Sequence, residues 1–311
     1  MLPPTVTETK KGVAVKRKKT GLTLVELLVV LGIIALLVGV LIPALTAVKN
    51  MAKETKQKAQ LTTISLALTA FRSDYGNYPP SAGWYYNPTP GGPLDYCGAQ
   101  KLAEALLGWD MLGFHPASVW RADGLDAASG PGTYDPPKTR DVNNDGVPDT
   151  LSERKGPYLE LATTNVFRLG VTAQHDGLFD FGLVNSPLAP AADTFVICDV
   201  FGKKKVVLAN GKNVRAGAPI LYYRANTSVK TIDTIYDVRD NDALVVAKEQ
   251  ADDREHPLAR PANQFQFFYD YIRDPRIDAR PWPYRPDSYI LISAGADGLY
   301  GTSDDICNFG N

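Results

Sequence analysis

The feature that most constrains the fold of this chain is a long apolar segment near its N-terminus. Nineteen consecutive residues, 27–45, carry no charge and are mostly Leu, Val and Ile. As an α-helix they would span roughly 28 Å, close to the thickness of the hydrocarbon core of a bilayer. The four residues 16–19 are all basic, and such residues mark the side of a membrane helix that stays in the cytoplasm. The sequence therefore predicts one membrane-spanning helix, with most of the chain exported.

A cleaved secretory signal and an uncleaved anchor are the two ordinary explanations of such a segment. A secretory signal has a shorter apolar core, followed by a cleavage site of small residues. The best downstream match is Ala44-Leu45-Thr46, which fits that pattern poorly. Neither explanation accounts for Glu26, an acidic residue at the start of the apolar run.

Residues 18–26 favour a third explanation. They read KKTG and then LTLVE. This resembles the class III signal of type IV pilins and type II secretion pseudopilins, in which a basic leader ends in Gly and an acid occupies the fifth mature position. The resemblance implies that a prepilin peptidase cleaves after Gly21 at the cytoplasmic face and that Leu22 is then N-methylated. Pro43 lies where such proteins often carry a helix-disturbing proline.

The new amine on Leu22 would give Glu26 a physical role. A lone acid costs about 2.5–3.5 kcal/mol at the centre of a membrane helix, and less near the interface. In a helical filament, Glu26 of one subunit can pair with the Leu22 amine of its neighbour. Because an unpaired buried charge is strongly unfavourable, this pairing would select against a wrong stagger. Alternatively, Glu26 caps the helix N-terminus and is stabilised by the macrodipole; both roles can hold at once.

The predicted helix continues beyond the membrane, over residues 22–75, with a transmembrane part at about 22–45. Its second half carries an amphipathic stripe that requires a partner sheet. Proline lacks an N–H and clashes with the preceding turn, so we expect local melting or a kink at Pro43. Residues 76–80, GNYPP, end the helix. The stripe consists of Leu61, Ile64, Leu68, Phe71 and Tyr75.

The chain after residue 76 contains strand-like runs bounded by Gly, Asn and Asp. Asn210-Gly211 between two of them is a strong hairpin signal. A helical pattern over 99–113, with Leu102, Leu106, Leu107 and Leu112, predicts a short helix on the core or, alternatively, on the surface. Helix first and antiparallel sheet afterwards indicate an α+β, pilin-like fold. The strand-like runs are 192–202, 203–212, 218–226, 264–272 and 287–295.

Several pieces of the region 76–311 resemble the globular domain of the major pseudopilin of type II secretion. These are FRSDYGNYPP at 71–80, GPYL at 156–159, and a split DVFG and PILYY at 199–202 and 219–223. Members of that family are much shorter, so we interpret residues 81–155 and 224–286 as insertions. The expected organisation is a cleaved leader at 1–21, the long helix at 22–75 and a globular domain at 76–311.

The C-terminal segment SAGADGLYGTSDDI, residues 293–306, is a candidate calcium loop. It places carboxylates among glycines directly after a strand, and hard oxygen ligands on a tight loop suit Ca²⁺. By resemblance to the pseudopilin calcium loop, Asp297, Asp304 and Asp305 would supply side chains and Ala294 a backbone carbonyl. The alternative is an acidic surface turn. The Gly spacing is not that of a dinucleotide-binding loop, and too few residues follow for the required helix.

A second candidate calcium loop is DVNNDGVPD at 141–149. Asp141, Asn143, Asp145 and Asp149 occupy positions 1, 3, 5 and 9 of an EF-hand-type loop, with Gly at position 6. Position 12 is a serine, so the closing bidentate carboxylate is displaced or absent. The pattern resembles the calcium repeats of extracellular proteins, and the alternative is an Asx-turn loop.

Charge and cysteine content exclude other classes. The first 21 residues hold six of the 33 basic and one of the 34 acidic residues, which leaves 27 bases and 33 acids, about −6, in the mature chain. This argues against nucleic acid as a partner. The three cysteines fit no zinc or CxxC site and allow one disulfide at most. The three histidines fall in no catalytic pattern, so we expect no enzyme.

These patterns together predict a filament subunit of a type II secretion system. Its expected partners are copies of itself, prepilin peptidase, minor pseudopilins, a secretion platform membrane protein and inner-membrane lipid, with Ca²⁺ as cofactor. Its expected location is the bacterial inner membrane, single-pass, with the C-terminal domain in the periplasm or on the surface. The alternatives are a type IV pilin and a membrane-tethered, calcium-dependent binding protein that does not polymerise.

Overall fold

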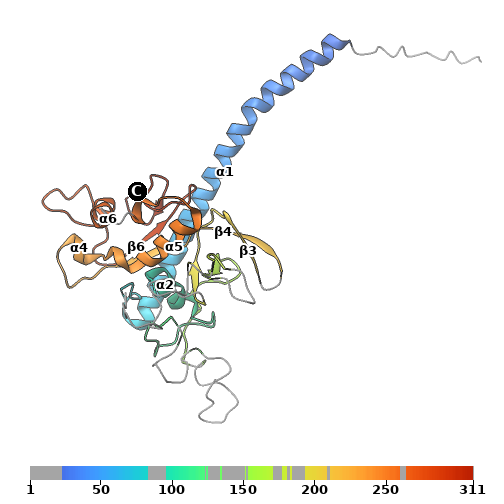
Figure 1. Cartoon of the computed structure of the whole chain (residues 1–311). Coiled ribbons are helices and arrows are strands. Elements are labelled where there is room, and N and C mark those ends of the chain that lie inside the picture. The colour runs from blue at the N-terminus through green and yellow to red at the C-terminus, as the bar shows by residue number, and fades with distance from the viewer. Residues whose placement is uncertain are drawn as a thin grey trace, which may run out of the picture. The chain divides into compact units, whose positions relative to one another are not determined.

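The computed structural model divides into two compact units, Met1–Lys49 and Asn50–Asn311, which are described here one at a time (Figure 1). It describes residues 23–82, 96–122, 124, 134, 151, 153–170, 177–180, 183, 193–208, 211–259 and 264–310.

Helix α1, Leu24–Tyr75, is the predicted long helix. Among the helices of the described residues, this one is long and apolar enough to cross a membrane. It runs through Pro43 without a break, so the expected local melting at that residue was wrong, and the alternative of a kink stays a prediction. Because Leu41, Ala44 and Leu45 beside it are strong helix formers, the loss of one hydrogen bond does not end the helix. The helix stops at Tyr75, where Gly76 adopts a φ of +79°.

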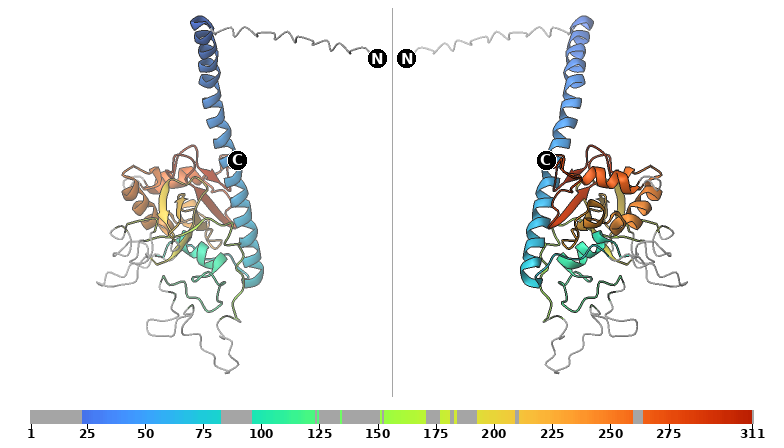
Figure 2. Two further views of the ribbon diagram at one scale, coloured as in Figure 1. Left: turned by 90° about the vertical axis from the view of Figure 1, so that its right-hand side faces the viewer. Right: turned by 90° about the vertical axis from the view of Figure 1, so that its left-hand side faces the viewer.

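Within the second unit, the stripe predicted for α1 is buried. Leu61, Ile64, Leu68 and Phe71 are at most 3% exposed, and Tyr75 is half-buried. They form what we call the α1-side core, together with residues from helix α2 (Gly98–Leu107) and from strands β5 (Leu221–Arg224) and β6 (Tyr289–Ser293). Figure 2 shows the lower part of α1 beside the C-terminal strands, coloured red.

The central sheet has three antiparallel strands in the order β5-β6-β7. Their bounds are Leu221–Arg224, Tyr289–Ser293 and Ile306–Cys307. Two antiparallel pairs accompany it: β1 (Val166–Arg168) with β2 (Phe195–Ile197), and β3 (Lys204–Val207) with β4 (Asn213–Ala216). The β3–β4 pair confirms the hairpin predicted from the sequence, and Gly211 adopts a φ of +75°, whereas Asn210 lies outside the described residues.

Strand β6 separates two cores, because all five of its residues are buried. Tyr289 and Leu291 belong to the α1-side core. Ile290 and Ile292 belong to a second cluster, which we call the insertion-side core and which includes Leu244, Phe268 and Ile272. This alternation follows from the period of two along a strand. The sheet is therefore the middle layer between α1 and the helices that follow β5.

The predicted insertion at 224–286 is mainly helical. The prediction of a strand at 264–272 was wrong, since these residues form helix α6. Aromatic residues favour strands locally, but Phe268 and Ile272, four positions apart, are both buried on one helical face. The elements are α4 (Ile232–Ile235), η3 (Val238–Asn241), α5 (Asp242–Asp252), η4 (Pro257–Ala259) and α6 (Gln264–Ile272).

Helix α2 packs in the core rather than on the surface, and each of its ten residues is buried. It ends at Leu107, earlier than the sequence pattern suggested, and Leu112 lies beyond it with 51% of its surface exposed. Gly98 at its start touches the sheet so closely that a Cβ there would lie 2.2 Å from the Tyr222 carbonyl oxygen. Helix and antiparallel strands together confirm the predicted α+β class, consistent with a pilin-like fold.

Replacing Leu68 by Ala should destabilise the second unit by about 3 kcal/mol, because it opens a cavity in the α1-side core. Leu68 is fully buried, whereas Leu66 on the same helix is 67% exposed. Leu66→Ala is therefore the matched control and should change the free energy of unfolding by less than about 0.5 kcal/mol. Chemical denaturation of the full chain in micelles, followed by near-UV circular dichroism, measures both. Equal effects would contradict the packing described here.

The buried Asp240 makes stability depend on pH. Its Oδ2 accepts a hydrogen bond of 2.6 Å from Ser81 Oγ. Burial raises the pKa of Asp240 to about 7, although the Ser81 hydrogen bond opposes the rise. The native state therefore holds a proton that the unfolded state has lost between about pH 4 and pH 7, and stability falls as the pH rises through that window.

Asp240→Asn should remove this dependence. Between pH 5.5 and pH 8 the wild type should lose ~2 kcal/mol more stability than the variant. Asp233→Asn, at an exposed position of the same insertion, should leave the wild-type slope unchanged. Denaturation curves at four or five pH values give the comparison, and parallel slopes for wild type and Asp240→Asn would contradict it.

Candidate acidic loop and assembly motif

The C-terminal acidic loop directly follows strand β6, as the sequence predicted, and it leads into β7. It is a tight loop because Gly295 adopts a φ of +60° and its backbone touches the other side of the loop. A Cβ at Gly295 would lie 2.2 Å from the Asp304 carbonyl oxygen, so no other residue fits there without displacing the chain.

Two of the three predicted ligands lie together in this loop. Asp304 Oδ2 accepts a hydrogen bond of 2.8 Å from the Asp297 N–H, and its Oδ1 accepts one of 2.6 Å from Thr302 Oγ1. Burial alone would raise the pKa of Asp304, but the hydrogen bonds from Thr302 and Asp297 outweigh it and lower the pKa. Asp304 is therefore an ionised carboxylate at neutral pH.

Asp305 is directed to different partners. Its Oδ2 accepts hydrogen bonds of 2.7 Å from both the Tyr271 hydroxyl and the Gly301 N–H. Its Oδ1 is buried and has no hydrogen-bond partner within the described residues. Burial raises the pKa of Asp305 to about 7, despite the hydrogen bond from Tyr271.

The donor types of the loop suit calcium, but the three carboxylates do not converge. Within the described ranges, no three Asp, Glu, His or Cys side chains form a group that could hold a metal ion. The Ala294 carbonyl, the fourth predicted donor, accepts a hydrogen bond of 3.1 Å from the Gly298 N–H. Asp305 Oδ1 is the orphaned oxygen that a cation could satisfy. Calcium binding here remains a prediction.

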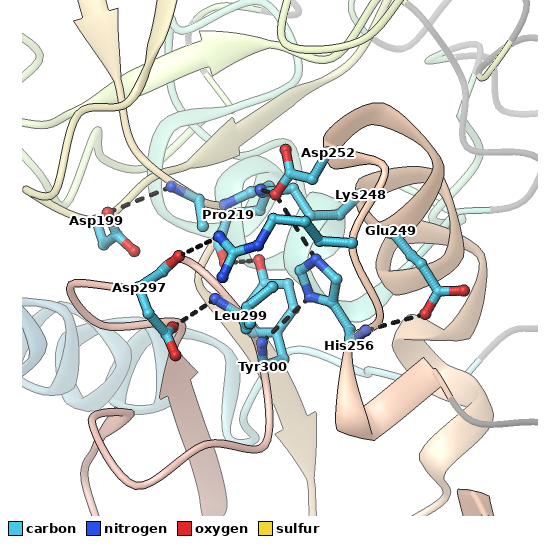
Figure 3. Close-up of polar contacts among 11 residues, drawn as sticks. Asp199, Pro219, Lys248, Glu249, Asp252, His256, Asp297, Leu299 and Tyr300 are labelled. Carbon is cyan, nitrogen blue, oxygen red and sulfur yellow. Dashed lines mark hydrogen bonds and ion pairs between the residues drawn. The ribbon is translucent and has the colours of Figure 1, made fainter.

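The helical insertion holds this loop in place, which the sequence did not reveal (Figure 3). Arg254, just after α5, donates a hydrogen bond of 3.0 Å from Nη1 to the Asp297 carbonyl oxygen. His256 is fully buried and its Nδ1 accepts one of 3.2 Å from the Tyr300 N–H. The segment Glu255-His256-Pro257 reads as a turn in sequence, and the burial of its histidine depends on contacts distant in the chain.

Several other residues predicted from the sequence lie outside the part of the chain that the structure describes. Asp141, Asn143, Asp145 and Asp149 lie outside the described residues, and so do Gly21 and Leu22. None of the three cysteines forms a disulfide bond: Cys97 and Cys198 are buried, and Cys307 is half-buried.

At the start of α1, Thr23 and Glu26 cap the helix reciprocally. Glu26 Oε2 accepts hydrogen bonds of 2.8 Å from the Thr23 N–H and 2.9 Å from its hydroxyl. The Glu26 N–H donates one of 3.2 Å to Thr23 Oγ1. This is a capping box, in which two helix-terminal donors are satisfied at once. The capping role proposed for Glu26 is therefore present, and within the described residues Oε1 has no partner.

The apolar residues of α1 in the first unit are exposed along its whole surface. Leu24 is 74% exposed, Leu36 70% and Ile42 61%. Exposed apolar area on this scale requires lipid or neighbouring chains to cover it.

Residues 16–42 match the family model of the prokaryotic N-terminal methylation motif. The chain carries a prepilin-type N-terminal motif. The match includes Gly21, Leu22 and Glu26, the three residues singled out from the sequence. No curated protein and no solved structure matches the chain.

The prepilin-type motif confirms the resemblance on which the sequence interpretation depended. Together with the long apolar helix, it indicates a pilin-like protein anchored in a membrane by a single span. Proteins with this motif are structural subunits that a prepilin peptidase processes and that assemble into filaments. They are not enzymes, in agreement with the expectation from the histidine pattern.

Proposed function

We propose that this protein is a filament subunit of a type II secretion system, which assembles through its N-terminal helix. The observation that carries the proposal is the motif at residues 16–42, followed by an apolar helix whose side chains are exposed on all sides. Lipid covers such a surface before assembly, and the same helices of neighbouring subunits cover it afterwards.

Glu26 would set the stagger between subunits. Its Oε2 accepts hydrogen bonds from Thr23, and its Oε1 has no partner among the described residues. After cleavage, the new amine of Leu22 on a neighbouring subunit carries a positive charge, opposite to that of Glu26, in a region with little water. A misplaced subunit would leave both charges unpaired, so the pair favours one register over the others.

A secretion filament is preferred to a type IV pilus because of the C-terminal acidic loop. Its sequence resembles the pseudopilin calcium loop, and its carboxylates lie in the loop that joins strands β6 and β7 of the central sheet. In this role the globular unit would face the periplasm, and the partners would include minor pseudopilins and the platform membrane protein.

Glu26→Gln should prevent filament assembly without preventing processing. Glutamine can still accept the Thr23 hydrogen bonds but has no charge to pair with an amine. Thr23→Ala is the matched control, because it removes the capping box, at a cost of about 1 kcal/mol, and keeps the charge. We expect mass spectrometry to find an N-methylated Leu22 at the N-terminus of the wild type and of both variants.

The chain is co-expressed with a secretion platform and peptidase, and filaments are counted by electron microscopy. The wild type and Thr23→Ala should form filaments, and Glu26→Gln should form none. Normal filaments from Glu26→Gln would remove the pairing role. A purified chain that still begins at Met1 and remains monomeric would instead favour the tethered binding protein.

We further propose that the C-terminal loop binds Ca²⁺ through Asp297 and Asp304, with Asp305 completing the site. Binding requires Asp304 to exchange its hydrogen bond with the Asp297 N–H for the cation. Extracellular calcium loops of this kind have dissociation constants of about 10⁻⁴–10⁻³ M, which suits an exported domain.

Saturating calcium should raise the melting temperature of the purified chain by about 5 °C, since a ligand at a hundred times its dissociation constant adds about 2.7 kcal/mol. Asp304→Asn should abolish the shift. Asp278→Asn, at an exposed position outside the loop, is the control and should keep it. An equal rise in Asp304→Asn, or no rise in the wild type, would contradict a calcium site in this loop.

A further inference from the structure

A cavity of about 220 Å³ lies beside the acidic loop, wholly within the second unit. Five segments line it: residues 178–179, residues 199–204 leading into β3, residues 216–219 at the end of β4, the C-terminal end of α5, and the loop at Gly295 and Gly298. Part of its wall is apolar and comes from Phe179, Phe201 and Pro219.

The charged groups around this cavity are unbalanced. Four cations line it, Lys203, Lys204, Lys248 and Arg254, against two carboxylates, Asp199 and Asp252.

Asp252 is already paired with Lys248, and it lies 3.7 Å from His256 Nε2. Figure 3 shows these three side chains grouped at the end of α5. Lys204 lies 3.9 Å from Asp180 at the exposed end of β3.

Asp199 does not neutralise the remaining cations. Its Oδ1 accepts hydrogen bonds of 2.9 Å from the Phe201 N–H and 3.3 Å from the Ala218 N–H. Its Oδ2 accepts one of 3.3 Å from Ser293 Oγ. Both carboxylate oxygens of Asp199 therefore accept hydrogen bonds from backbone or serine donors rather than from the lysines or Arg254.

Lys203 and Arg254 remain without a carboxylate partner among the described residues. A Cβ at Gly298 would lie 3.2 Å from Lys203 Nζ, which places the ammonium at the rim formed by the loop. Partial burial and the nearby Arg254 lower the pKa of Lys203, although Asp297 opposes this. Two neighbouring cations that share no ion-paired carboxylate repel each other, and an incoming anion would relieve that repulsion.

We propose that this cavity binds a carboxylate carried on a small apolar body, with Lys203 and Arg254 holding the carboxylate and Phe179, Phe201 and Pro219 contacting the body. A short-chain organic acid has this chemistry, and so does the C-terminal residue of a polypeptide. A bare phosphate would leave the apolar wall uncovered and would bring a second negative charge towards Asp199. The site is independent of filament assembly, since its lining residues all lie within residues 178–298.

The probe is hexanoate, with hexanamide as its neutral counterpart of the same length. Isothermal titration of the full chain in micelles should give saturable binding of hexanoate and none of hexanamide. Lys203→Gln should weaken hexanoate binding about tenfold, as expected for the loss of one hydrogen bond to a charged group. Lys205→Gln is the matched control, because this exposed lysine lies two residues further along, on β3 and outside the cavity lining, and it should bind like the wild type.

Four outcomes decide the proposal. Equal binding of hexanoate and hexanamide, or equal weakening by Lys203→Gln and Lys205→Gln, overturns it. Phosphate binding as tightly as hexanoate also overturns it, since the apolar wall would then contribute nothing. Acetyl-Ala-Leu with a free carboxylate, compared with its amide, separates the two sources: tighter binding than hexanoate supports a polypeptide end, and weaker binding supports a free acid. Unchanged melting temperatures show that both variants fold.

Discussion

The burial of β6 on both faces is the constraint on which the second unit depends. A strand whose every residue is buried needs a layer on each side, and α1 can supply only one. The stripe from Leu61 to Phe71 covers the face of Tyr289 and Leu291. The opposite face, with Ile290 and Ile292, must be covered by other parts of the chain, and the helices between β5 and β6 do this.

This requirement gives the insertion at 224–286 a structural role. Phe268 and Ile272 from α6 and Leu244 from α5 complete the insertion-side core. The same segment also contacts the acidic loop. Arg254 donates a hydrogen bond to the Asp297 carbonyl oxygen, and His256 accepts one from the Tyr300 N–H. This one segment therefore covers the sheet, fixes the loop and supplies part of a cationic cavity.

The sequence predicted the elements whose signals are local. The stripe on α1 has a helical period, the hairpin has its Asn-Gly turn, and the prepilin-type motif is a contiguous pattern, so each could be identified without tertiary information. Residues 264–272 were assigned incorrectly because aromatic residues favour strands, whereas the helical form is selected by burial of Phe268 and Ile272. The contacts of Arg254 and His256 with the loop join residues more than 40 positions apart, and no local pattern encodes such a pairing.

Two glutamines show how α1 obtains a unique position on the sheet. An apolar stripe with helical period could slide by one turn and still bury Leu against Leu. Gln57 is fully buried, and its Oε1 accepts a hydrogen bond of 3.0 Å from the Val200 N–H. Gln60 Nε2 donates one of 2.9 Å to the Cys198 carbonyl oxygen. A shift by one turn would leave these buried groups unpaired, at about 1–3 kcal/mol each.

The remaining amide atoms, Gln57 Nε2 and Gln60 Oε1, are buried without a partner among the described residues. Each glutamine therefore contributes less to stability than an apolar residue would. Its role is to fix the register in which residues 50–75 pack on the sheet.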